Sequence, residues 1–355
     1  MKRLKKYFLY LLFIFLILNL IILILWKGVY NFSLSKKDIY SDIVSKQIGI
    51  TKEEELDFYK EFWVKRKFKY VKFIGELEQE TNSQKYLNIT KRNGRYNGIN
   101  NNCSHKIIFY GSSSLFGYNV KDNQTVPFYF KKYLDNNNEN KYCVFNYGSA
   151  SHFSTHENIF FQNQFINKTI SKNDILIFID GTAENGNHTS KVDLTLEKLF
   201  AYTHQNVIDK YKFTIPLTFE TFPIFQIFKL KSQNNNLDLD NKSFNELKFV
   251  FQSNIKIRNI LCKKLGLKCF TFLQPLPLIS GKKIKSHLNI KDKEIKKKYW
   301  EEKYNNLKDT KDIIDLNGIL KMNKEISFVD PIHYSPSASK IIAQSILFKI
   351  EKYLD

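Results

Sequence analysis

One long uninterrupted apolar segment lies near the start of the chain, at residues 7–26. Asn19 is the only strongly polar residue within it. A helix of about 20 residues, rising about 1.5 Å per residue, matches a hydrocarbon core of roughly 30 Å. Tyr7, Tyr10 and Trp26 lie near its ends, where aromatic rings favour the membrane interface. The pattern therefore predicts an N-terminal transmembrane helix.

The residues flanking this segment predict its orientation. Four basic residues precede it, so the short N-terminus is expected in the cytoplasm: Lys2, Arg3, Lys5 and Lys6. The alternative is a cleaved signal peptide, whose apolar region would be only about 7–15 residues and would end at a small-residue cleavage site. Because the run is longer and ends in Leu25-Trp26-Lys27, an uncleaved anchor in the inner, cytoplasmic membrane is favoured. The C-terminal part is then extracytoplasmic, on the periplasmic side.

From residue 105 onward, short apolar runs alternate with helical patterns. Strands are expected at 106–110, 142–147, 174–180 and 269–273, and helices at 124–134, 155–167 and 244–265. Continuous apolar runs are typical of strands buried on both faces of a parallel sheet. Their alternation with helices predicts an α/β fold of three layers, α/β/α, with a mainly parallel, flavodoxin-like sheet and right-handed crossovers.

This alternation also divides the chain. Residues 1–26 form the cytoplasmic tail and anchor, 27–104 a linker and lead-in, and 105–355 the α/β domain. The lead-in contains an amphipathic helical pattern in 52–70, with one side made of Leu56, Tyr59, Phe62 and Trp63. Residues 186–243 are too long for a simple crossover and predict an insertion, which can serve as a lid. Residues 281–312, rich in Lys and Glu, predict a solvated helical excursion.

Composition changes this picture little. Hydrophobic residues make up 43% of the 355 positions, which is enough for a sizeable core. The formal net charge is +20. Such a charge can indicate nucleic acid or anionic membrane partners. Since the lysines are dispersed and no nucleic-acid-binding motif is present, a solvated lysine-rich surface without a nucleic acid partner is favoured. A mild attraction to acidic glycans or lipid headgroups is compatible with it.

The four cysteines permit two disulfides in an exported domain. Cys262 and Cys269 flank a short connection between a predicted helix and a predicted strand, which makes them the favoured pair. Cys103 and Cys143 would start two neighbouring strands. Four free buried thiols are the alternative. The cysteine and histidine spacing does not indicate a metal site.

Candidate chemistry gathers where predicted strands end. Ligands of open parallel sheets bind at the carboxyl ends of the strands. The first three strands lead into Gly111–Gly117, Asn146-Tyr147-Gly148 and Gly181–Asn185, and Asp330-Pro331-Ile332-His333 comes near the C-terminus. A serine hydroxyl needs a base to become a nucleophile, an imidazole can be that base near neutral pH, and a carboxylate can orient the imidazole. Each motif alone is weak, but their order and placement point to one site.

In that order, the motifs resemble those of the SGNH, or GDSL-like, hydrolases, in particular their membrane-anchored envelope members. The resemblance covers roughly residues 105–350, and Phe272-Leu273-Gln274-Pro275 also fits the fourth strand end of such relatives. It implies that Ser113 is the nucleophile and that Asp330 and His333 complete the triad. It further implies that the N–H groups of Ser113 and Gly148 form part of the oxyanion hole.

One position departs from the family pattern. The third motif usually supplies an Asn side chain to the oxyanion hole, and Ala183 occupies that position here. Losing one such donor typically lowers the rate by about 10²–10³-fold. Asn185, two residues further on, could substitute if the loop is rearranged. Glu184 could contact substrate or lie on the loop surface.

The resemblance implies a serine esterase that needs no metal or organic cofactor. Its predicted location favours acyl, in particular O-acetyl, esters on cell-envelope glycans as substrates. A glycan O-acyltransferase using the same triad, or a degenerate glycan-binding or assembly module, are the alternatives. The sequence leaves the natural substrate, the effect of Ala183, the disulfide state and the oligomeric state open.

Overall fold

The computed structural model describes residues 39–184, 241–280 and 293–354, apart from 72–73, 82–83, 91–93, 99–102, 137–141 and 278, together with parts of 6–25. The chain divides into two compact units. The larger unit comprises Tyr40–Leu199 and Leu239–Asp355, and the smaller one Met1–Ile39 and Phe200–Asp238. Most of the predicted insertion, residues 186–240, lies outside the described residues.

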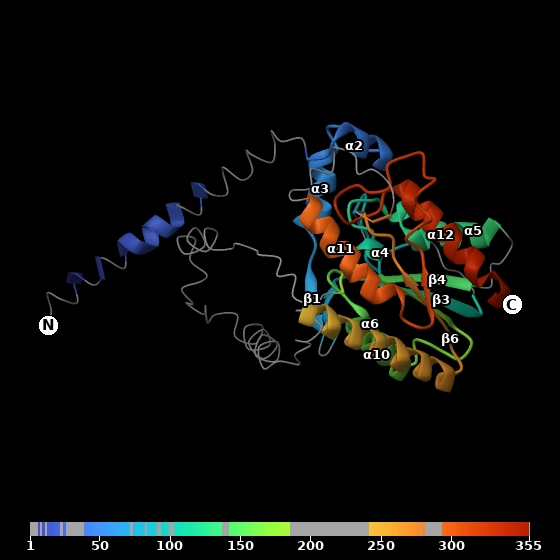
Figure 1. The fold of residues 1–355 in the computed structure, drawn as a ribbon. Helices are drawn as coiled ribbons and strands as arrows, with labels where there is room; N and C mark the ends of the chain where they lie inside the picture. The colour runs from blue at the N-terminus through green and yellow to red at the C-terminus, as the bar shows by residue number, and fades with distance from the viewer. Residues whose placement is uncertain are drawn as a thin grey trace. The chain divides into compact units, whose positions relative to one another are not determined.

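A five-stranded parallel sheet forms the centre of the larger unit (Figure 1). Its spatial order is β4-β3-β5-β6-β7. The strands are β3 (His105–Gly111), β4 (Tyr142–Gly148), β5 (Ile175–Asp180), β6 (Lys268–Leu273) and β7 (Ile313–Asp315). The first four confirm the predicted strands and the flavodoxin-like order. The three-residue β7 escaped prediction because it has no apolar run of useful length.

Side chains alternate along each strand and so build two cores. Ile107 and Phe109 of β3 pack on one face with α5 (Val126–Asn136) and α12 (Pro336–Ile350). Ile108 and Tyr110 pack on the other face with α6 (Ser154–Ile166) and α10 (Asn241–Leu265). Figure 1 shows these two helix pairs on opposite sides of the sheet. The three-layer α/β/α prediction is confirmed.

The segment predicted as a linker and lead-in belongs to the larger unit from residue 40 onward. It forms α2 (Asp42–Ile48), α3 (Glu55–Trp63) and a hairpin of β1 (Phe68–Val71) and β2 (Gly75–Glu78). Phe58 and Phe62 of α3 are buried in a core that also contains Phe116 and Tyr118. Because these rings contribute to the packing beside the end of β3, the segment is part of the domain.

The amphipathic prediction for 52–70 needs correction in its details. The helix ends at Trp63, and its buried face is formed by Phe58 and Phe62, one helical turn apart. Trp63 is 49% exposed. The spacing of apolar residues permitted two faces, and the contact with the core selected this one.

The excursion predicted at 281–312 is helical but less solvated than expected. Residues 281–292 lie outside the described residues, and α11 (Lys293–Lys308) follows. Tyr304 and Leu307 of α11 pack against Phe251 of α10, and Lys303 is buried. The larger unit also contains two short 3-10 turns, η1 (Asp122–Gln124) and η4 (Glu351–Tyr353).

The predicted anchor is only partly described. Residues 13–21 are helical, and Asn19 Nδ2 donates to the carbonyl oxygen of Phe15 at 2.8 Å within that helix. Within the described residues, no helix has both the length and the hydropathy needed to span a membrane. Residues 8, 11–12, 22–23 and 26 of the predicted span lie outside that description.

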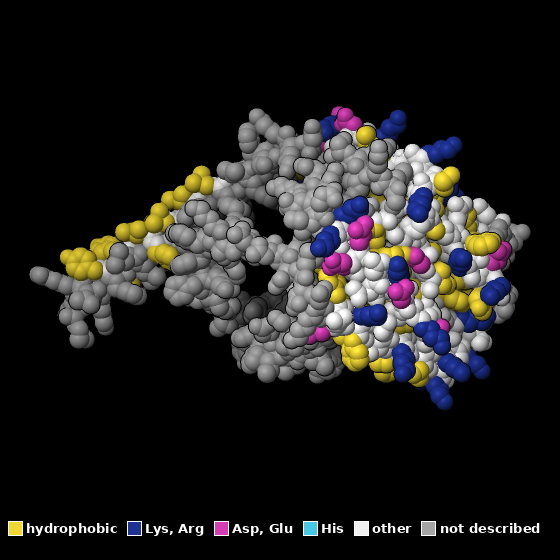
Figure 2. Space-filling view, in the orientation of Figure 1, with side chains coloured by type: hydrophobic (Ala, Val, Ile, Leu, Met, Phe, Trp, Pro, Cys, Tyr) yellow, Lys and Arg dark blue, Asp and Glu magenta, His cyan; other side chains and the backbone are white. Residues whose placement is uncertain are grey.

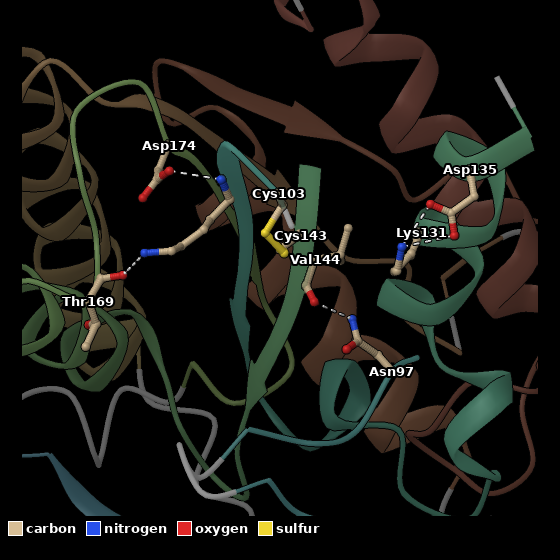
Figure 3. Close-up of a disulfide and its surroundings, with 9 residues drawn as sticks. Asn97, Cys103, Lys131, Asp135, Cys143, Val144, Thr169 and Asp174 are labelled. Carbon is tan, nitrogen blue, oxygen red and sulfur yellow. Dashed lines mark hydrogen bonds and ion pairs between the residues drawn. A yellow bond between two sulfur atoms is a disulfide. The ribbon is translucent and has the colours of Figure 1, made fainter. Parts of the chain in front are cut away.

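Two disulfides join the four cysteines. Cys103 is bonded to Cys143 and Cys262 to Cys269. The first joins the start of β4 to the residue two before β3, at the amino end of the sheet (Figure 3). The second spans the turn between α10 and β6. On the face in Figure 2, Lys and Arg side chains are spread among acidic ones, as the solvated-surface interpretation expects.

Candidate active site

Ser113 lies two residues beyond the end of β3, the second strand in the order of the sheet. β3 ends at Gly111, Ser112 is extended, and Ser113 begins the single-turn helix α4 (Ser113–Phe116). Gly148, at the end of the neighbouring strand β4, makes room for that turn. A Cβ on Gly148 would lie 2.3 Å from the Phe116 nitrogen, a separation that no side chain can keep. The two strand ends therefore position the serine over the sheet edge.

Asp330 and His333 come from a tight turn before α12. The Asp330 Oδ1 atom accepts hydrogen bonds from the backbone N–H groups of Ile332 (2.9 Å) and His333 (2.8 Å). These bonds fix the carboxylate against its own turn. Ser335 then caps α12 by accepting from the Ala338 N–H at 3.1 Å. The local sequence thus places both side chains rigidly at the start of the last helix.

The structure brings the three predicted triad residues together. His333 Nε2 lies 3.0 Å from Ser113 Oγ, and His333 Nδ1 lies 2.6 Å from Asp330 Oδ2. Ser113 and His333 are 220 positions apart in the sequence. One imidazole nitrogen faces the hydroxyl and the other faces the carboxylate, which is the arrangement that lets a serine lose its proton to a histidine.

The electrostatics suit these roles. Burial alone would raise the pKa of Asp330, but the interaction with His333 and the hydrogen bonds from His333 and Ile332 outweigh it, so its pKa lies below the usual range. The carboxylate therefore stays charged near neutral pH and can accept a hydrogen bond from His333 Nδ1–H.

Three residues around the triad, Tyr118, Arg66 and Asn119, were not predicted. The Tyr118 ring stacks on His333, with centroids 5.1 Å apart and planes 19° apart. Arg66, 4.2 Å from the Tyr118 centroid, covers that ring and pairs with Glu78. Asn119 Nδ2 donates to Asp330 Oδ2 at 2.8 Å. These residues follow α4 or belong to the lead-in, and only their position beside the triad distinguishes them from ordinary core residues.

The predicted oxyanion donors have different surroundings. Ser113 opens α4, and N–H groups in the first turn of a helix have no acceptor within it. The Gly148 N–H, in contrast, donates to Asn146 Oδ1 at 3.0 Å. To serve an oxyanion, it would have to share or leave that acceptor. Ala183 has no donor in its side chain, and Asn185 lies outside the described residues.

Glu184 was expected either to contact substrate or to lie on the loop surface, but its side chain is buried. Its side chain is fully buried and accepts from the Ser154 N–H (2.6 Å) and the Ser154 hydroxyl (3.2 Å). It therefore secures the first turn of α6. Burial, followed by the nearby Asp180 charge, raises the pKa of Glu184 to about 7.

A buried charge cluster adjoins Glu184. Arg258 of α10 is fully buried and donates to Asp180 at the end of β5 (2.7 Å) and to Glu157 of α6 (3.3 Å). Lys303 of α11 donates to the Thr182 carbonyl oxygen at 2.8 Å. The cluster joins α6, α10 and α11 to the end of β5.

Comparisons with known proteins give similar folds at low identity. No protein-family model matches the chain, and no curated protein sequence matches it. An acetyl xylan esterase structure is similar with a TM-score of 0.39 and 11% identity, covering 69% of this chain and 99% of that one. A goat rumen metagenome lipase has a TM-score of 0.40 and 12% identity, covering 71% and 100%. A G-D-S-L family lipolytic protein from Veillonella parvula has a TM-score of 0.37 and 13% identity, covering 70% and 100%. At these scores the similarities add no argument about the site, whose assignment depends on its own geometry.

Proposed function

We propose that this chain is an SGNH-type serine esterase that hydrolyses acyl esters. The observation that carries the proposal is the continuous contact of hydroxyl, imidazole and carboxylate: Ser113 Oγ, His333 and Asp330, at 3.0 Å and 2.6 Å. A serine and an imidazole in hydrogen-bond reach, with the imidazole oriented by a third group, is the signature of an activated nucleophile. The position at the carboxyl ends of parallel strands supports the same role.

The reaction follows from these contacts. Ser113 Oγ attacks the ester carbonyl while His333 Nε2 takes its proton, and Asp330 stabilises the resulting imidazolium. His333 then returns the proton to the leaving alcohol, which leaves an acyl group on Ser113. Water then attacks the acyl carbonyl while His333 takes its proton, and His333 returns that proton to Ser113 Oγ as the bond to the acyl group breaks and the acid leaves. The proposed oxyanion donors are the N–H groups of Ser113 and Gly148, and the Gly148 N–H would have to leave Asn146 Oδ1 to take part.

The proposed substrates are O-acetyl esters on cell-envelope glycans, reached from a membrane anchor at residues 7–26. Three observations support a membrane-anchored, extracytoplasmic location. Except for Phe15, the large apolar side chains in the described parts of the segment are 40–67% exposed, and Figure 2 shows apolar side chains along it. Asn19 keeps its amide bonded to its own helix, which lowers the cost of a polar group in lipid. Both disulfides also suit an oxidising, extracytoplasmic compartment.

A second candidate is a glycan-binding module without turnover. Two observations favour it: Ala183 lacks the usual amide donor, and the Gly148 N–H is already bonded to Asn146. An O-acyltransferase differs from the esterase only in its acceptor, a sugar hydroxyl in place of water.

The test is covalent labelling of the full-length chain in detergent with a fluorophosphonate probe, together with p-nitrophenyl acetate hydrolysis. We expect labelling at Ser113, and loss of both labelling and hydrolysis in Ser113→Ala. The matched control is Ser114→Ala, because the Ser114 hydroxyl faces the Ile332 carbonyl oxygen (3.4 Å) and not the imidazole. A folded chain that neither labels nor hydrolyses would support the binding module. Labelling that persists in Ser113→Ala would place the nucleophile elsewhere.

A further inference from the structure

Asn119 connects the catalytic turn to the segment that precedes the α/β domain. It lies two residues after Gly117, the residue that caps the end of α4. Its side chain is only 4% exposed, and its backbone is left-handed, with a φ of 59°. Asparagine is one of the few non-glycine residues that adopt this conformation readily. Its Nδ2 donates to Asp330 Oδ2 at 2.8 Å.

The chemistry of its neighbours fixes the orientation of the Asn119 amide. Asn119 Oδ1 accepts from Trp63 Nε1 and from the Tyr40 hydroxyl, each at 3.0 Å. An indole N–H can only donate, and a charged carboxylate can only accept. The amide oxygen must therefore face Trp63, and the amide nitrogen must face Asp330. Burial raises the pKa of Tyr40 far above its ordinary value, so its hydroxyl keeps the proton that it donates.

We propose that Asn119 is a positioning residue for the triad and that Tyr40 and Trp63 hold it in place. The Asp330 carboxylate then has four donors: the N–H groups of Ile332 and His333 on Oδ1, and His333 Nδ1 and Asn119 Nδ2 on Oδ2. Asn119 supplies the only one of the four that comes from outside the Asp330–His333 turn. It therefore fixes that turn relative to the helix carrying Ser113.

This inference rests on the proposed function and extends it to the lead-in. The segment at residues 40–63, which precedes the first strand of the sheet by about 40 residues, becomes part of the catalytic assembly. A bond to a charged group in a partly buried site contributes more than one between neutral groups, so its loss is expected to be measurable in turnover.

The test compares Asn119→Gly with Asn119→Asp in the full-length chain. Glycine keeps the left-handed backbone and removes the amide. Aspartate keeps an oxygen for Trp63 and Tyr40 but places a second carboxylate against Asp330. We expect Asn119→Gly to lower kcat for p-nitrophenyl acetate by about 10–100-fold with KM within about twofold. We expect Asn119→Asp to lose at least as much, since it replaces attraction by repulsion.

A purely structural role predicts a different result. If Asn119 only anchored the lead-in, both variants would lose thermal stability, but their kcat measured well below the unfolding temperature would match that of the original chain. That result would overturn the inference. Asn173→Gly, at an exposed left-handed position (φ 76°) away from these contacts, is the matched control and should leave kcat unchanged.

The reaction of the unsubstituted chain with the fluorophosphonate probe distinguishes a failure of this inference from a failure of the proposed function. If that chain does not react with the probe, the esterase proposal fails, and the positioning role fails with it. If it reacts and both Asn119 variants react at its rate, only the positioning role fails. As a further check, the double variant Tyr40→Phe with Trp63→Phe removes both donors to Asn119 Oδ1. It should lower kcat in the same direction as Asn119→Gly.

Discussion

At the end of β5, the buried acidic side chains outnumber the buried basic ones. Three carboxyl groups, Asp180, Glu157 and Glu184, share this region with two bases, Arg258 and Lys303, and all five side chains are buried. Burial, with the charge and hydrogen bond of Asp180, raises the pKa of Glu157 well above its ordinary value. A buried unpaired charge is costly, so Glu157 and Glu184 retain protons that they would release in water, and burial lowers the pKa of Lys303 to about 7. It is a structural feature with a measurable dependence on pH.

Glu184 allows that dependence to be tested at one residue. Its pKa rises from 4.5 to about 7 on folding. Between those values the folded chain keeps a proton that the unfolded chain has released, so stability falls as the pH rises from 4.5 to 7. Glu184→Gln removes this contribution. The free energy of unfolding should be measured in urea at pH 5 and at pH 7.5. Between these values it should fall by on the order of 2 kcal/mol more in the original chain than in the variant. An equal difference at both pH values would refute the assignment.

At the scale of elements, the turn from β3 into α4 depends on a close approach between backbones. The α4 turn lies over the end of β4, where a Cβ on Gly148 would come within 2.3 Å of the Phe116 nitrogen. The obstacle is backbone, which cannot rotate away as a side chain can. The glycine in this motif therefore has a packing role in addition to any role as an oxyanion donor.

Gly148→Ala should displace α4 and the serine that begins it. We expect a loss of at least about 2 kcal/mol in the free energy of unfolding, as for overpacked sites, together with slower probe labelling. Thermal unfolding and labelling rates measure the two effects. Gly318→Ala is the control, because a Cβ there would meet nothing within 4 Å. Normal labelling and stability in Gly148→Ala would mean that the turn can relax at little cost.

At the scale of the whole molecule, the disulfide Cys103–Cys143 and the triad occupy opposite ends of the sheet. The disulfide lies beside the first residues of β3 and β4, and Ser113 follows the last residue of β3. Seven strand residues separate them, on the order of 20 Å. The disulfide should therefore affect stability and leave the chemistry unchanged.

Replacing both Cys103 and Cys143 by serine tests this separation. The two cysteines are 40 positions apart, so the chain-entropy relation gives a stabilisation of about 4 kcal/mol. The Cys262–Cys269 pair, 7 positions apart, should contribute about 2 kcal/mol by the same relation. Urea unfolding of the two double variants should show that order. Labelling of Ser113 well below the unfolding temperature should be unchanged in both, and its loss would contradict the separation.

The proposed membrane orientation is also tested on the whole chain. A periplasmically active phosphatase reporter fused after Asp355 should be active, because the basic residues before the apolar segment favour a cytoplasmic N-terminus. A matched fusion of a reporter that works only in the cytoplasm should be inactive. The reverse pair of results would overturn both the anchor orientation and the proposed glycan substrates.

Several elements could be predicted from sequence because their signals are local. The apolar runs of β3, β4, β5 and β6 indicate buried strands without reference to the rest of the fold. The same approach missed β7, which is too short to have a pattern, and for α3 it predicted the buried Phe62 but also the half-exposed Trp63, and it missed Phe58. In both cases a neighbouring element, and not the segment itself, determined the outcome.

Periodicity and motif chemistry involve residues only a few positions apart, and they sufficed to predict four of the five strands of the sheet, the layer order and three candidate side chains, Ser113, Asp330 and His333. The packed fold was needed to show that the Gly148 N–H is bonded to Asn146, that Glu184 is buried, and that Asn119 joins Trp63 to Asp330. Asn119 and Asp330 are 211 positions apart. Contacts over such separations depend on how complete elements pack, and short-range patterns along a chain do not contain that information.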